Sequence, residues 1–112
     1  MADFIKNIEQ RQKLVMNEQV DYLAGQVVSK TLAQNDHHSL TLFAFDAGEE
    51  ISTHKSGGDA LITVLDGTGK ITIEETEFIL NVGEAIVMPA GKPHAVYAKT
   101  KFKMFLTVIF DK

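Results

Sequence analysis

The sequence predicts an all-β domain, a small sandwich or barrel of about nine short strands. From residue 26 onward, short runs in which apolar and polar residues alternate are separated by clusters of turn residues at close, regular spacing. This period of two is typical of strands that bury one face. No segment shows the long 3.6-residue period of helices, which argues against helical bundles and parallel α/β folds.

The predicted strands follow Gly25, where the pattern changes character. They cover residues 27–32, 39–45, 51–54, 60–65, 70–74, 78–80, 85–88, 94–98 and 102–110. The dipeptide Asp66-Gly67 predicts a hairpin, because glycine readily adopts the positive φ that such a turn needs. The acidic run of residues 74–77 predicts a second hairpin tip, and we interpret it as a solvated turn rather than a cation site.

Residues 1–24 precede the predicted barrel, which covers residues 25–112. In this first segment Asp3 is a plausible N-cap, and Phe4, Ile5 and Ile8 would share one side of a helix. Three polar residues at positions 10–12 interrupt that apolar stripe. The segment is therefore expected to form a short amino-terminal helix or an extended arm.

Composition excludes several classes of protein. A chain of 112 residues has room for one domain, and its net charge of −4 with scattered lysines offers no basic field for nucleic acid. The absence of cysteine excludes disulfides, thiolate metal sites and thiol nucleophiles. Without a signal-peptide pattern or an apolar run long enough to cross a membrane, we expect a cytoplasmic protein with no membrane partner.

Two segments place histidines at fixed distances from glycine and proline. They read Gly48-x5-His54-x-Ser56-x3-Ala60-x6-Gly67 and Gly83-x5-Pro89-x-Gly91-x2-His94-x3-Ala98. These segments resemble the two motifs of the cupin family, G-x5-H-x-H-x3-E-x6-G and G-x5-P-x-G-x2-H-x3-N. The resemblance spans residues 48–98 and implies a small single-domain cupin of the conserved-barrel type, a double-stranded β-helix or jelly-roll barrel.

The departures from these motifs concern metal binding. In the family, two histidines and a glutamate of the first motif join the histidine of the second around a divalent metal. Here Ser56 and Ala60 stand at the second histidine and the glutamate positions, so only His54 and His94 remain as candidate metal ligands. Because catalytic zinc usually has three protein ligands, any cofactor is expected to be a weakly bound Zn, Ni or Cu ion, and otherwise none.

Asp59 is a possible third ligand, since it lies one position before the missing glutamate. Strand alternation should turn it outward, and only a shift of register would bring it inside.

The two histidines are expected to face an apolar pocket inside the barrel. Alternation places Val96 on the same face of its strand as His94. The last strand is expected to line the pocket with the face that carries Phe102. The predicted pocket residues are His54, His94, Ser56, Ala60, Ile62, Val96, Met104 and Leu106. Such a cavity fits a small, partly apolar ligand with one polar or anionic group. The pair His37-His38 is interpreted as part of a surface loop.

Three functions remain open. The favoured hypothesis is a cupin that binds a small molecule in its barrel. The second is a metal-dependent cupin enzyme of the isomerase or dioxygenase type that uses His54 and His94, with catalytic residues unknown. The third is a dimeric regulatory or sensor module.

A homodimer is expected in each case. Both faces of the strand 39–45 are largely apolar, and Leu61, Leu65, Phe105 and Ile109 should lie opposite the pocket. Apolar side chains exposed in this way usually mark an interface.

Overall fold

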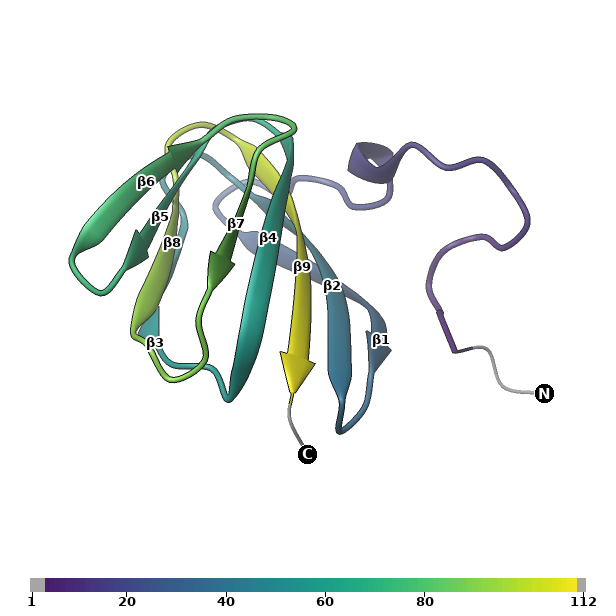
Figure 1. The fold of residues 1–112 in the computed structure, drawn as a ribbon. Coiled ribbons are helices and arrows are strands. Elements are labelled where there is room, and N and C mark those ends of the chain that lie inside the picture. Colours follow the sequence, from purple (N-terminus) through teal and green to yellow (C-terminus); the bar gives the residue numbers. More distant parts are fainter. Residues whose placement is uncertain (1–3, 111–112) are drawn as a thin grey trace.

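The computed structural model describes residues 4–110, which form nine strands and one short 3-10 helix, η1 (Met16–Glu18). The strands are β1 (Val27–Gln34), β2 (His38–Phe45), β3 (Glu50–His54), β4 (Gly58–Asp66), β5 (Gly69–Ile73), β6 (Thr76–Leu80), β7 (Ala85–Met88), β8 (His94–Ala98) and β9 (Phe102–Phe110). All pairings are antiparallel, in a five-stranded sheet ordered β1-β2-β9-β4-β7 and a four-stranded sheet ordered β3-β8-β5-β6. The predicted all-β, jelly-roll fold is confirmed (Figure 1).

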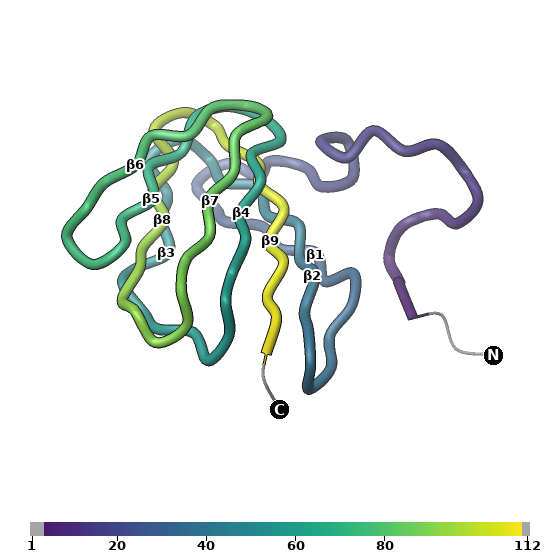
Figure 2. Tube along the Cα trace, in the orientation of Figure 1, coloured from purple at the N-terminus to yellow at the C-terminus, as the bar shows by residue number. Residues whose placement is uncertain are grey.

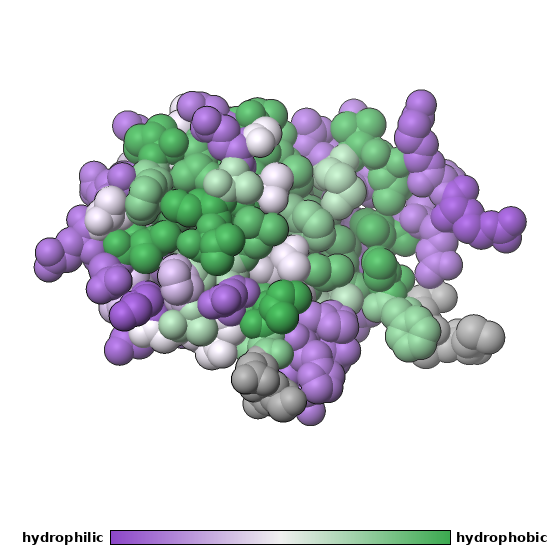
Figure 3. Space-filling model, viewed as in Figure 1, coloured by the Kyte–Doolittle hydropathy of each residue, from purple (hydrophilic) through white to green (hydrophobic). Residues whose placement is uncertain are grey.

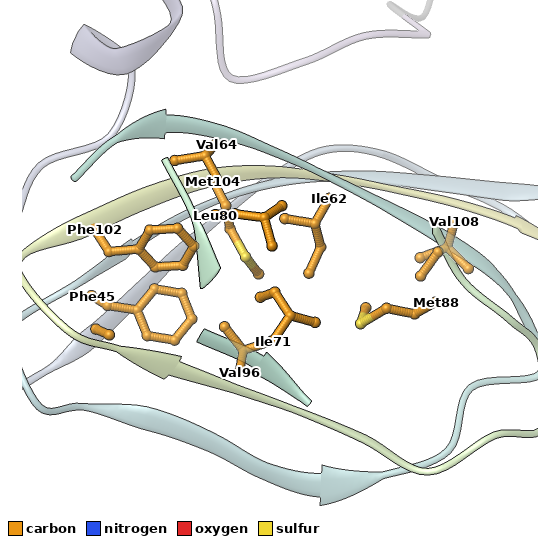
Figure 4. Packing of buried hydrophobic residues seen from close by; sticks show 12 residues of the cluster. Phe45, Ile62, Val64, Ile71, Leu80, Met88, Val96, Phe102, Met104 and Val108 are labelled. Atoms are coloured by element: carbon orange, nitrogen blue, oxygen red, sulfur yellow. The ribbon is translucent and has the colours of Figure 1, made fainter. Parts of the chain in front are cut away.

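The main core lies between the two sheets. Alternate residues of strands from both sheets point inward and toward one another, as Figure 4 shows for Ile62 and Met104 from one sheet and Ile71 and Val96 from the other. The rings of Phe45 and Phe102 pack with centroids 5.3 Å apart. The alternation along β9 is the one that the sequence predicts, with Phe102, Met104 and Val108 buried on the core face.

The connection at Asp66-Gly67 is not a hairpin, so that prediction was wrong. Strand β4 pairs with β7 and β9, whereas β5 pairs with β6 and β8, so the turn carries the chain from one sheet to the other. Glycine is required here by close approach, because a Cβ on Gly67 would lie 1.8 Å from the carbonyl oxygen of Lys101. The hairpin at the acidic run is present: Ile73 and Thr76 pair across a tip formed by Glu74 and Glu75.

The amino-terminal segment is an extended arm that contains the short 3-10 helix η1. Residues 4–15 contain no helix, and Asn7 and Arg11 have left-handed backbones with φ of 69° and 62°, which interrupt any right-handed helix. Asp3, the proposed N-cap, lies outside the described residues. Figure 2 traces the arm in purple past η1 to β1.

The arm covers part of the outer face of the five-stranded sheet. A second hydrophobic cluster forms there. Its buried members are Val20, Leu32, Leu42 and Ala44, with Ile8, Met16, Tyr22, Val28, Leu40, Leu65 and Phe105 packed around them. The outward apolar face of β2 is therefore buried by the chain itself. Leu65 and Phe105, which the sequence predicts at a dimer interface, lie in this cluster.

Polar contacts hold the arm in place. Lys103, only 9% exposed, donates from Nζ to the backbone oxygen of Asn17 at 2.5 Å and lies 4.8 Å from the centre of the Tyr22 ring. The Tyr22 hydroxyl donates to Asp66 at 2.5 Å. Burial, more than the carboxylate of Asp66, raises the pKa of Tyr22 far above its ordinary value, so this hydroxyl remains a donor.

Substituting Val20→Ala should test how much the arm contributes to stability. Val20 belongs to the arm and is 4% exposed where it packs on the sheet, so losing two methyl groups and leaving a cavity should cost about 2 kcal/mol of unfolding free energy. Val15→Ala is the matched control, because Val15 lies in the same arm but is 51% exposed. Urea unfolding of both variants would measure the difference. Equal stabilities would mean that the arm does not pack on the sheet in solution.

Candidate functional site

The two motif histidines lie opposite each other on neighbouring strands of the four-stranded sheet. His54 ends β3 and His94 begins β8, and the two are partners in the strand register. An irregularity of the register between Ile51 and His54 precedes the pair. His94 is buried with 2% exposure, whereas His54 is exposed, so the pair lies where the barrel opens to solvent.

The imidazole rings meet through their Nε2 atoms. These atoms are 3.1 Å apart, and the ring planes are inclined by 73°. Each Nδ1 faces a backbone carbonyl, that of Ser52 at 2.9 Å and that of Lys92 at 3.2 Å. A carbonyl oxygen only accepts, so each Nδ1 carries the proton and donates it. Both Nε2 atoms then carry a lone pair, and at a separation of 3.1 Å a shared proton or a metal ion could join them.

The pair has the geometry of a two-nitrogen metal site. Two metal–nitrogen bonds of about 2.0–2.1 Å that span a separation of 3.1 Å enclose an angle of about 100° at the metal. That angle lies between the octahedral and tetrahedral values. The two backbone carbonyls also orient the rings, as the outer partners of metal-bound histidines do. The residues present therefore fit a divalent ion bound through two nitrogens.

A third protein ligand is missing from the described residues. Between residues 4 and 110, no three His, Asp or Glu side chains are grouped to hold a metal. Ser56 uses its Oγ to accept from the backbone N–H of Gly58 at 3.2 Å, and Ala60 lies in the core. Asp59 is exposed and accepts from the backbone N–H of Ala90 at 2.8 Å, so it fastens a loop instead of reaching the histidines.

The pKa of His94 is lowered below its ordinary value of 6.5, mainly by burial and secondly by the nearby His54. The hydrogen bond to the Lys92 carbonyl has a smaller, opposing effect. The unfolded chain then binds more protons than the folded one between the lowered pKa and 6.5. Stability should be fully present above about pH 6.5 and should decline as the pH falls through that window. Urea unfolding at several pH values with a chelator present would measure this, and His94→Gln should remove its share of the decline. A stability that does not change between pH 7 and 5 would contradict the assignment.

The predicted pocket inside the barrel is not open. Ala60, Ile62, Val96 and Met104 are at most 2% exposed and pack against one another in the main core, with Leu106 packed against them. Side chains from both sheets fill this space. These residues therefore support the site from below and do not line a cavity.

An open hollow lies beside the histidines instead, between the β5–β6 hairpin and β7. Its volume is about 970 Å³, within the range of small-molecule sites. It is lined by Ile73, Glu74, Glu75, Thr76, Phe78, Ile86, Val87, Pro89 and Pro93. We call this hollow the mouth groove. Figure 3 shows hydrophobic side chains gathered over this part of the molecule, around β6 and β7.

The mouth groove adjoins the histidine pair. Neither histidine lines it, but Pro93 precedes His94, and Ile73 is the cross-strand partner of His94. Sequence reasoning missed this hollow although it predicted the strands around it. One feature of the sequence could have indicated the hollow: β6 and β7 are both short and carry outward apolar residues. That these two strands form the facing edges of the two sheets depends on the strand order, which the sequence does not show.

His37 and His38 remain structural. The backbone N–H groups of both donate to Oδ1 of Asn35, at 2.8 and 3.0 Å, which shapes the β1–β2 turn. This agrees with the interpretation of the pair as part of a surface turn.

The fold and the paired histidines define a small single-domain cupin barrel. A model of the cupin domain matches residues 41–110, and the chain belongs to the cupin family. Among curated proteins, none matches the sequence.

Three solved structures extend the comparison. The chain is similar to a conserved protein of unknown function from Streptococcus pyogenes, with 40% identity over 99% of this chain and 97% of the other and a TM-score of 0.96. A cupin superfamily protein from Desulfitobacterium hafniense has 33% identity, coverage of 96% and 98%, and a TM-score of 0.91. A cupin 2 conserved barrel domain protein from Leptotrichia buccalis has 45% identity over 83% of this chain and 45% of the other, with a TM-score of 0.81.

In the part of the chain that the structure describes, no helix has the length and apolar character needed to cross a membrane.

Proposed function

We propose that this cupin binds a small, partly apolar molecule at the mouth of its barrel, with a polar group at the histidine pair and an apolar part in the mouth groove. The observation that carries the proposal is the close approach of two Nε2 atoms, 3.1 Å apart, near an open hollow in which six of the nine lining residues are aliphatic, aromatic or proline. Apolar lining with a few convergent polar groups is the usual composition of a small-molecule site.

The histidine pair suits either of two kinds of polar group. A proton shared between the imidazoles would give the pair a positive charge that attracts an anionic group. A loosely held Zn, Ni or Cu ion would leave coordination positions free for an oxygen or nitrogen atom of the ligand. In both cases the backbone carbonyls of Ser52 and Lys92 keep the rings oriented before the ligand arrives.

A fragment titration followed by NMR tests the proposal. Small aromatic and aliphatic acids, alcohols and amines would be added to the isotope-labelled full chain, with and without Zn²⁺. We expect His94 and Phe78 to shift together with at least one of these fragments, and His54→Ala to weaken that binding. If no fragment perturbs both residues at millimolar concentration, the proposal fails.

A metal-dependent enzyme is the second candidate, of the isomerase or dioxygenase type. It is favoured by the two Nε2 atoms of His54 and His94, which lie 3.1 Å apart and could hold a divalent ion between them. When bound, such an ion would supply Lewis-acid chemistry, and this chain would contribute its two imidazoles and the adjoining groove. Elemental analysis of protein purified without an affinity tag separates the candidates: one firmly held ion per chain favours the enzyme, whereas no ion, or an ion that is lost during purification, favours the binder.

We also propose that the chain is a homodimer, which would suit a regulatory or sensor module as well. With Leu65 and Phe105 covered by the arm, the support comes from Leu61, Val87 and Ile109, which are 40%, 53% and 58% exposed. Leu61 and Val87 are cross-strand partners, and together they present an apolar surface on the five-stranded sheet. Light scattering at micromolar concentration should give twice the mass of the chain. A monomer under those conditions would contradict the proposal.

A further inference from the structure

We propose that the ligand of the mouth groove is an amphipathic cation, whose apolar body lies against Phe78 and Ile86 and whose protonated amine or guanidinium group faces Glu74 and Glu75. The proposal rests on the proposed function, since the ligand's apolar body lies in the same groove, and it adds a cationic group at the hairpin tip to the polar group at the histidine pair. It goes further in assigning a charge to the ligand and a recognition role to the tip of the β5–β6 hairpin.

The lining of the mouth groove has charge of one sign. Six of its nine residues are aliphatic, aromatic or proline, and the charged ones are Glu74 and Glu75, with no lysine, arginine or histidine among them. A ligand that fills the groove therefore meets two carboxylates and no positive side chain of the lining. Both carboxylates are exposed and the groove is open, so water and salt screen them and their attraction for a cation is modest.

The two carboxylates are not engaged with other side chains as their neighbours are. Glu77, on the same hairpin, forms an ion pair with Lys70 at 3.3 Å. Glu84 uses Oε1 to accept from the backbone N–H of Asn81 at 2.7 Å. Within residues 4–110 no ion pair or side-chain hydrogen bond involves Glu74 or Glu75. Their charges remain open to a ligand.

The hairpin tip is held at the groove and does not extend freely into solvent. The backbone N–H of Glu74 donates to the carbonyl of Pro93 at 2.8 Å, which ties the tip to the residue before His94. Glu74 also has a left-handed backbone, with φ of 56°, where glycine or asparagine is more usual. The carboxylates are therefore carried on a fastened turn at one end of the groove, close to the strand that bears the histidine.

Three probes that share one apolar body test the proposal. These are 2-phenylethylamine, which is protonated at pH 7, the neutral 2-phenylethanol, and the anionic 3-phenylpropionate. Binding to the full chain at low salt would be followed by NMR shifts of Phe78 and Ile86. We expect the amine to bind about three- to tenfold more tightly than the alcohol, because it gains two partly solvated charge contacts. This difference in affinity should become smaller in 0.5 M salt, which screens the charges.

Variants distinguish charge recognition from general binding. The double substitution Glu74→Gln and Glu75→Gln should abolish the preference for the amine while the alcohol binds as before. Phe78→Ala should weaken amine and alcohol alike, and the exposed Glu50→Gln on β3 is the matched control that should change neither. Equal binding of amine and alcohol, or tighter binding of the acid, would overturn the cation proposal and leave the proposed function standing. No binding of any probe or fragment would overturn both.

Discussion

The paired substitutions Ser56→His and Ala60→Glu are expected to raise the affinity for Ni²⁺ or Mn²⁺ by at least about two orders of magnitude, since protein sites that hold catalytic metals firmly use about three ligands. The two histidines already converge with their Nε2 atoms 3.1 Å apart. The added side chains would stand at the two motif positions where the cupin family carries its other ligands. The new ligands would thus join a preformed pair.

The metal-free double variant should be less stable than the parent. Ala60 is 2% exposed in the main core, so a glutamate there is crowded and lacks a partner until the metal binds. An unpaired buried carboxylate should cost about 3–5 kcal/mol, or else become protonated. Saturating metal should restore much of that loss, because binding to the folded state alone stabilises it.

Calorimetric titration of parent and double variant would measure the affinities, and thermal unfolding with and without metal would measure the linked stability. The control is Ser56→Asn with Ala60→Gln, which changes the same positions without adding an imidazole or a carboxylate. Equal affinity in parent and double variant would mean that the natural site already has a further ligand, or that Ser56 and Ala60 do not face the histidines.

Replacing Gly67 with alanine is expected to cost about 3–5 kcal/mol of unfolding free energy, from a strained backbone and a steric clash together. Gly67 has φ of 71°, and its new Cβ would lie 1.8 Å from the carbonyl oxygen of Lys101 and 2.9 Å from Oγ1 of Thr100. Because the nearest atom is backbone, the clash is relieved only if the connection between the sheets moves.

Gly48→Ala separates the two causes. Gly48 has a similar φ of 82°, but an added Cβ would meet no atom within 4 Å. Its substitution should cost only the left-handed backbone penalty, about 1–2 kcal/mol. Urea unfolding of both variants gives the comparison, and equal losses would show that the close approach to Lys101 is absent in solution.

The fold class could be predicted because its signals are local. Alternation along β9, the turn residues between runs, and the motif spacings each depend on residues close together in the chain. The motif also predicted that His54 and His94 would come together, and the structure brings their rings into contact. The Asp66-Gly67 hairpin failed because a turn signal shows that the chain reverses direction, not which sheet the next strand joins.

For a related reason, the sequence could not show how full the interior of the barrel is. Alternation correctly placed Ile62, Val96 and Met104 on inward faces, but it does not show whether the space between those faces is filled. Side chains of two sheets fill it, and the free volume lies instead where the edges of β6 and β7 face each other.

The sequence by itself determined the all-β fold, the inward faces of the strands, and a histidine pair without the other metal ligands of its family. The tertiary structure decided where an opening remains, that the arm covers the outer face of β2, and that Glu74 and Glu75 lie at the groove beside His94. The physical reason is that periodicity and spacing act between neighbours in the chain, whereas cavities and covered faces arise from strand order and from the fit of side chains distant in sequence.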